Sequence, residues 1–193
     1  MSDQWCRQTL NEALARTVAE CTTAESSVLE ISGEAWRDRG FGSYRSVEYP
    51  EFDICVDRLR ERFDLIIAEQ VFEHIRHPSW AARNVYRMLK PGGRFVISTP
   101  FLVRYHPLPT DYWRWTQPGL ACLLEDAGFV DVHCDSWGNR EVVIANLDEW
   151  VDFDATAHQM DNDPDLPIQV WGVGTRPGRR QALRHLLRPS GPA

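Results

Sequence analysis

Two continuous apolar runs constrain the fold of this chain more than any other feature of its sequence. Residues 63–71 (FDLIIAEQV) and 94–101 (RFVISTPF) have the apolar composition of strands that are buried on both faces of a sheet. The segment between them, PSWAARNVYRMLKPGG, has apolar residues at helical spacing, with Pro78 in its first turn and Gly92-Gly93 at its end. This order predicts two parallel strands that are joined by a crossover helix.

The same alternation of strands and helices continues on both sides of this unit. Further strands are predicted at 26–32, 43–50, 130–137 and 167–177, and further helices at 3–23, 117–129 and 140–160. The whole pattern predicts an α/β fold with a doubly wound, mostly parallel sheet. Ligands bind such sheets beyond the carboxyl ends of the strands, where the strand order reverses.

Two short segments are less well determined. Residues 52–56 (FDICV) fit either an edge strand or an extended loop. Only ten residues, GEAWRDRGFG, separate the first two predicted strands. Because that length barely accommodates two turns of helix, we expect the first crossover to be reduced to a loop.

Length, charge and cysteine content limit the functional classes. The 193 residues predict one domain at 1–177, followed by a basic tail at 178–193. A net charge of −7 argues against a surface that coats nucleic acid. No apolar run approaches the roughly 20 residues that cross a membrane, and the N-terminal segment lacks the apolar centre of a signal peptide. The sequence leaves the oligomeric state open, with a homodimer as one option.

The five cysteines indicate the compartment. None of them has C-x-x-C spacing, so the sequence predicts neither a cysteine zinc site nor a disulfide framework. We therefore expect free thiols, a reducing cytoplasm and no metal ion.

The segment FDLIIAEQVFEHIRHPSWAARNVYRMLKPGGRFVISTPF, followed by DYWRWTQPGLACLLEDAGF, resembles class I S-adenosylmethionine-dependent methyltransferases. These proteins have a strand, an acidic turn ending in EH, a helix closing on LKPGG, another strand, an aromatic segment and AGF. The resemblance covers residues 26–137. It implies a Rossmann-like fold with a seven-stranded type of sheet, S-adenosyl-L-methionine as cofactor and a small molecule as methyl acceptor.

The resemblance implies that the cofactor site begins at the end of the first strand. There EISGEAW keeps Gly33 of the family's glycine-rich turn, but has Ser32 in place of the first glycine. Glu30 takes the family's acidic place and would meet the methionyl ammonium, or else would cap nearby backbone. Glu48 ends the second strand, where a carboxylate can accept hydrogen bonds from both ribose hydroxyls.

Two further groups of residues complete the implied cofactor site. Asp53, with Asp57 as a competing candidate, would accept a hydrogen bond from the adenine amine. Ile54 would pack on the adenine ring. Glu69 and Gln70 end the strand at 63–71 and would face the methionyl part of the cofactor.

The acceptor side is predicted in the segment TPFLVRYHPLPTDYWRWT, residues 99–116. A proline-rich, aromatic loop at a strand end is suited to a pocket wall. His106 is the candidate base because an imidazole titrates near neutrality. Asp111 would orient it, and Arg114 would pair with an anionic group of the acceptor. His74, in the EH pair, is interpreted as a structural histidine more readily than as a base.

Two other functions remain open on the sequence. The chain could use the same cofactor for a reaction other than methyl transfer, such as a cyclisation. It could also be a methyltransferase-like binding protein without catalysis, which the reduced glycine turn favours and the carboxylates at the strand ends oppose.

Overall fold

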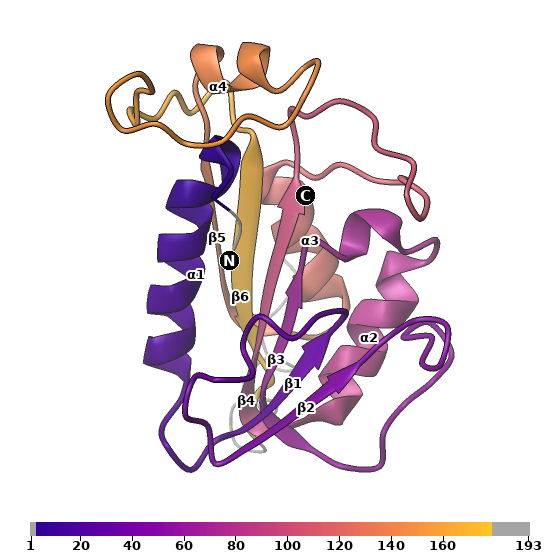
Figure 1. The fold of residues 1–193 in the computed structure, drawn as a ribbon. Coiled ribbons are helices and arrows are strands. Elements are labelled where there is room, and N and C mark those ends of the chain that lie inside the picture. The colour runs from indigo at the N-terminus through magenta and orange to yellow at the C-terminus, as the bar shows by residue number, and fades with distance from the viewer. Residues whose placement is uncertain (1–2, 179–193) are drawn as a thin grey trace.

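The protein, seen here as a computed structural model that describes residues 3–178, is built on one twisted sheet (Figure 1). Within those residues six strands lie in the order β2-β1-β3-β4-β6-β5. Their bounds are β1 Ser27–Ile31, β2 Ser43–Val47, β3 Phe63–Glu69, β4 Leu89–Pro100, β5 Val130–Trp137 and β6 Gln169–Thr175. The first four are parallel, whereas β6 runs antiparallel to β4 and β5. The prediction of a mostly parallel α/β sheet is confirmed.

Helices cover both faces of this sheet. Their bounds are α1 Gln8–Cys21, α2 Pro78–Met88, α3 Gln117–Asp126 and α4 Arg140–Ala145, with short 3-10 helices η1 Trp5–Arg7 and η2 Phe72–His74. Helix α1 lies against one face, and α2 and α3 lie against the other (Figure 1). The sheet is therefore doubly wound, as the sequence predicts.

The strand residues divide between two cores, one on each face. Leu65 and Ile67 of β3 pack in the cluster that includes Leu14 of α1. Ile66 and Ala68 of the same strand pack in the opposite cluster, together with residues of α2 and α3. Since side chains alternate between the faces of a strand, a strand covered on both sides must be apolar throughout.

The structure decides one open alternative and differs from one predicted helix. Residues 52–56 form a loop with turns, the second of the two options, so the sheet has six strands within the described residues. The helix predicted at 140–160 ends at Ala145, because the chain beyond it pairs with the N-terminal segment. Trp5 donates its backbone N–H to the Val151 carbonyl at 2.8 Å, and Gln4 forms an antiparallel bridge with Asp152.

No helix lies between β1 and β2, as expected from the short connection. The carboxylate of Glu30 holds this loop in place. It accepts hydrogen bonds from the backbone N–H groups of Ala35 and Trp36, each at 3.0 Å. It also accepts one from the Tyr44 hydroxyl at 2.5 Å. Glu30 is only 2% exposed and Trp36 only 1%, so the loop is anchored into the core on the α1 side.

The basic tail predicted from residue 178 onward lies outside the described residues, apart from Gly178. Among the helices of residues 3–178, none combines the length and the apolar character needed to cross a bilayer.

The loop after β1 gives a first testable prediction. Gly33 has a φ of +136°, and a Cβ there would lie 3.0 Å from Glu30 Oε1. We expect Gly33→Ala to lower the free energy of unfolding by about 2 kcal/mol or more, because backbone strain and the displaced carboxylate act together. Gly40→Ala is the control. It has a φ of +76° with no atom within 4 Å of its Cβ, and we expect a cost of about 1 kcal/mol. Urea unfolding measures both, and equal costs would contradict the role of Glu30.

Candidate active site

The strand order reverses between β1 and β3. From β1 the chain moves to β2 on one side, whereas β3 lies on the other side and leads to β4. The residues that follow these two strands, Ser32 and Gln70, have positive φ values of 62° and 57° although neither is glycine. Such conformations cost about 1–3 kcal/mol each and concentrate at functional sites. The site that the sequence predicts at the carboxyl ends of the strands therefore coincides with strained backbone.

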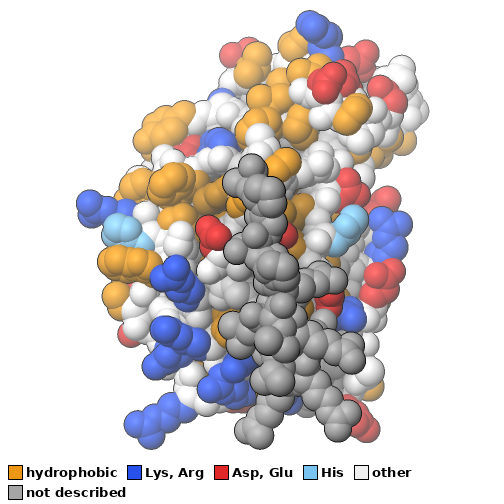
Figure 2. All heavy atoms as spheres, turned by 180° about the vertical axis from the view of Figure 1, so that it is seen from behind, with side chains coloured by type: hydrophobic (Ala, Val, Ile, Leu, Met, Phe, Trp, Pro, Cys, Tyr) orange, Lys and Arg blue, Asp and Glu red, His pale blue; other side chains and the backbone are white. Residues whose placement is uncertain are grey.

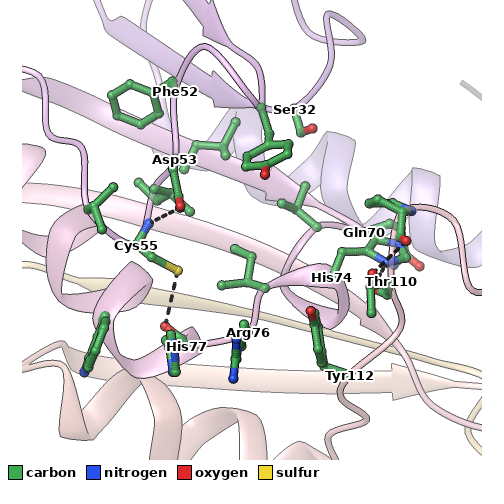
Figure 3. Close-up of a pocket in the computed structure, with 18 residues that line it drawn as sticks. Ser32, Phe52, Asp53, Cys55, Gln70, His74, Arg76, His77, Thr110 and Tyr112 are labelled. Atoms are coloured by element: carbon green, nitrogen blue, oxygen red, sulfur yellow. Dashed lines mark hydrogen bonds between the residues drawn. The ribbon is translucent and has the colours of Figure 1, made fainter.

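A pocket of about 390 Å³ opens at this point (Figure 3). Its volume lies in the usual range for small-molecule sites. Five of its lining residues are Ser32, Asp53, Ile54, Gln70 and His74. In Figure 3, Ser32 and Asp53 lie on one side of the cavity, with Gln70 and His74 beside Thr110 on another. The pocket thus joins the predicted cofactor side to the predicted acceptor side.

The wall formed by residues 52–56 is held by hydrogen bonds. Asp53 Oδ1 accepts from the backbone N–H of Cys55 at 2.8 Å, so one oxygen of this carboxylate is used within the loop. The buried side chain of Asn84, on α2, donates to the carbonyls of Ile54 at 2.9 Å and of Cys55 at 3.1 Å. Sequence analysis missed Asn84, because an asparagine within a helix does not reveal its hydrogen-bond partners until its neighbours in space are known.

The other predicted cofactor residues lie in different surroundings. Glu48 is exposed beside the pocket and accepts a hydrogen bond from the Ser32 hydroxyl at 3.1 Å. Glu69 forms an ion pair with Arg7 and accepts from Trp36 Nε1 at 3.0 Å. Like Glu30 and Gly33, Glu69 does not line the pocket. Glu30 and Glu69 therefore bind protein groups, and their hydrogen bonds hold the loop after β1 on the side away from the pocket.

The three predicted catalytic residues lie together in the loop between β4 and α3. Asp111 is bound by two nitrogens of Arg114, Nη2 at 2.6 Å, and by the backbone N–H of His106 at 3.1 Å. His106 Nδ1 lies 3.3 Å from Asp111 Oδ2. Burial lowers the pKa of His106, so the neutral imidazole is favoured. Burial by itself would raise the pKa of Asp111, but its hydrogen bonds from Arg114 and His106 lower it.

These three residues do not line the pocket, but His74 connects them to it. The rings of His74 and His106 contact each other edge to face, with centroids 5.1 Å apart. His74 Nδ1 lies 2.7 Å from the Thr110 carbonyl, and both residues line the pocket. The carbonyl of Glu73 accepts from the backbone N–H of Tyr112 at 2.8 Å, which holds the loop against η2.

The comparison with known protein families decides the relationship of this chain. Residues 7–133 match a family model described as a methyltransferase domain, which is more than half of the chain. The chain belongs to this methyltransferase family. The resemblance to S-adenosylmethionine-dependent methyltransferases, inferred from LKPGG and its neighbours, is thereby confirmed.

Solved structures show the same fold for this methyltransferase. Phosphoethanolamine N-methyltransferase 2 of Haemonchus contortus, in complex with phosphomonomethylethanolamine and S-adenosylhomocysteine, superposes with a TM-score of 0.61 at 13% identity, over 86% of this chain and 52% of that one. A SAM-dependent methyltransferase from Archaeoglobus fulgidus gives a TM-score of 0.58 at 15% identity, over 86% and 93% of the two chains.

Curated relatives match only a short stretch. The ubiquinone biosynthesis O-methyltransferase of Pseudomonas putida (strain W619) is 38% identical over 55 residues. That stretch covers 28% of this chain and 24% of the relative.

Besides Asn84, sequence analysis missed the carboxyl of Glu73 in this methyltransferase. It is 1% exposed, and its Oε2 has no hydrogen-bond partner among the described residues. Burial raises the pKa of Glu73 to about 8. The EH pair was visible in the sequence, but only the packing of η2 against the loop of residues 101–116 reveals that this glutamate is enclosed.

The raised pKa of Glu73 gives a second prediction. Between its ordinary pKa of 4.5 and a folded-state pKa of about 8, the folded chain binds a proton that the unfolded chain releases. Stability should therefore fall as pH rises through this window, with a slope approaching about 1.4 kcal/mol per pH unit. Glu73→Gln should lack this contribution, so its stability relative to wild type should rise from pH 5 to pH 8. Urea unfolding in EDTA-containing buffers measures both proteins, and parallel pH profiles would contradict the enclosed carboxyl.

Proposed function

We propose that this protein transfers a methyl group from S-adenosyl-L-methionine to a small-molecule acceptor by in-line displacement. The observation that carries the proposal is the pocket at the strand-order reversal. It is bounded by the strained turns after β1 and β3 and reaches His74 on its far side. When bound, the cofactor supplies a methyl group on a positively charged sulfur; the protein has to align the acceptor and exclude water.

The residues present fit this cofactor. The mostly apolar wall near Ile54 suits the adenine ring, and the second oxygen of Asp53 remains available to its exocyclic amine. Glu48, fixed by Ser32, would accept from the ribose hydroxyls. Gln70 would lie beside the methionyl part. S-adenosylmethionine has no phosphate, so the loss of a glycine at Ser32 removes less binding than it would for a dinucleotide.

On the acceptor side, we assign His106 as the group that takes the acceptor's proton, with Asp111 as its positioning residue. Arg114 would attract an anionic substituent of the acceptor. An oxygen acceptor with an apolar body is supported by the short match to ubiquinone biosynthesis O-methyltransferases and by exposed aromatic side chains of this loop. Tyr105 is 67% exposed and Trp113 is 42% exposed.

The surface seen from behind separates apolar from basic side chains. Hydrophobic side chains gather in the upper part of this face, toward which β3 and β4 point, and most Lys and Arg side chains lie lower (Figures 1 and 2).

The five cysteines are free thiols, which supports the expectation of a reducing cytoplasm.

A binding protein without catalysis is the second candidate. It is favoured by one observation, the engagement of Glu30 and Glu69 by protein groups. Such a protein would bind S-adenosylhomocysteine but would transfer no methyl group in any acceptor screen.

Cofactor binding tests the first part of the proposal. We expect calorimetric titration to detect S-adenosylhomocysteine binding, and Glu48→Ala to weaken it at least tenfold, because charge-assisted hydrogen bonds to the ribose are lost. Glu51→Ala removes an exposed carboxylate from the same loop and should leave the affinity unchanged. No binding to the folded wild-type chain would contradict the proposal, and an unaffected Glu48 variant would remove the ribose assignment.

Turnover tests the second part. In His106→Ala we expect the formation of S-adenosylhomocysteine, measured with a panel of phenols, catechols and amines, to fall at least about 100-fold. The affinity for S-adenosylhomocysteine should stay within twofold of wild type. Full turnover in this variant would exclude His106 from the reaction.

A further inference from the structure

Three side chains beside the pocket form a cluster that the proposed cofactor does not use. Glu73, His74 and His106 each offer a possible ligand atom, and these atoms lie within 4.8 Å of one another. His74 Nε2 lies 3.8 Å from Glu73 Oε1. The other carboxyl oxygen, Glu73 Oε2, is buried and has no hydrogen-bond partner among the described residues. A buried polar atom without a partner is costly, so its retention calls for a ligand.

The two imidazoles are held in the orientation that metal-binding histidines have. His74 Nδ1 lies 2.7 Å from the Thr110 carbonyl, so this nitrogen carries the proton and Nε2 keeps its lone pair. His106 Nδ1 lies 3.3 Å from an Asp111 oxygen and 3.4 Å from the Arg104 carbonyl, and also 3.4 Å from Arg114 Nη2; the two acceptors favour a proton on Nδ1 and a lone pair on Nε2. Histidine ligands of metals characteristically donate their second N–H to a carboxylate or a backbone carbonyl.

The charges around the cluster leave room for a cation. The two guanidinium groups that act on Glu73 are those of Arg114 and Arg7. Arg114 is paired with Asp111, and Arg7 is paired with Glu69. Each of these two positive charges is therefore offset by a carboxylate other than Glu73.

We infer that Glu73, His74 and His106 form a binding site for a divalent cation, Zn²⁺ in preference to Mg²⁺. Two histidines and one carboxylate with an open position are a donor set of catalytic zinc sites, whereas Mg²⁺ selects oxygen ligands. In a tetrahedral site, ligand atoms about 2.1 Å from the ion are about 3.4 Å apart. The candidate ligand atoms lie within 4.8 Å of one another, so the widest separation has to close by up to about 1.4 Å when the cation binds, through rotation of the side chains. The sequence predicted no metal ion because that expectation rested on cysteine spacing, whereas the proposed ligands are histidine and glutamate.

The use of this site rests on the proposed methyl transfer. An acceptor hydroxyl that enters the pocket beside His74 would take the open position, and the cation would lower its pKa. The hydroxyl would then lose its proton to water, and its oxygen would attack the methyl carbon. The C–O bond would form as the C–S bond breaks, and the sulfur would leave as the neutral thioether S-adenosylhomocysteine. In this arrangement His106 holds the cation and cannot also take the proton, so the cation is the alternative to the base role of His106: methyl transfer lost in EDTA supports the cation, and methyl transfer retained in EDTA supports the base.

Titration of the full chain with Zn²⁺, after EDTA treatment and dialysis, tests the inference. We expect calorimetry to show one site per chain, weakened at least tenfold in each of Glu73→Gln, His74→Ala and His106→Ala. His133→Ala, in β5, is the matched histidine control and should bind as wild type does. The same chain loaded with Co²⁺ should show visible d–d bands without the intense near-ultraviolet bands of thiolate ligands, which separates this site from the free cysteines.

The outcomes distinguish the two proposals. No Zn²⁺ binding, thiolate bands, or unchanged affinity in the three variants would overturn the cation site. If S-adenosylhomocysteine binds and methyl transfer occurs in EDTA, the proposed function stands and the cation has no part in it. If Zn²⁺ binds but S-adenosylhomocysteine does not, the cation site stands and the proposed function fails. Thermal unfolding checks that each variant is folded. Because Glu73→Gln keeps the size of the side chain, it tests the cation site even if a histidine variant fails to fold.

Discussion

The buried carboxylate of Glu30 is the interaction on which the site depends. With one glycine fewer than the family's turn and no crossover helix after β1, the loop has little regular structure to hold it. Glu30 supplies the missing restraint by accepting hydrogen bonds from the backbone N–H groups of Ala35 and Trp36. The indole Nε1 of Trp36 in turn donates a hydrogen bond to Glu69. Glu69 is paired with Arg7, so the loop, the end of β3 and the segment leading into α1 form one network. Buried polar groups that are fully hydrogen-bonded in this way make a structure rigid.

This network explains why strain can persist at the pocket. Ser32 and Gln70 have positive φ values, and their neighbours in sequence, Gly33 and Glu69, lie beside or in this network, which restrains both turns. Glu30 and Glu69, which the sequence suggested as direct cofactor ligands, are engaged by protein groups around the loop after β1. What remains for the pocket is an apolar wall at residues 52–56 on one side and a charged, histidine-containing corner on the other. That division suits a reaction in which an adenosyl group is packed and an acceptor is activated.

Prediction from sequence succeeded where the pattern is local. The run at 63–71 had to be a strand buried on both faces, and Pro78 had to begin a helix, because periodicity and backbone geometry decide both. It failed at 140–160, where the helical pattern was overridden beyond Ala145 by pairing with the segment around Gln4. It also failed to predict that Glu73 is buried, because the burial of a side chain depends on which distant loop covers it.

The sequence by itself determined the doubly wound sheet, the loop after β1 and the family, because these follow from apolar spacing, segment length and motifs in order. It also placed the candidate residues at strand ends. Only the tertiary structure decided which of them line the pocket: Asp53 and Gln70 do, whereas Glu30 and Glu69 accept hydrogen bonds from Trp36. The reason is physical. A carboxylate binds whichever donors fold around it, and those donors come from segments that the sequence keeps far apart.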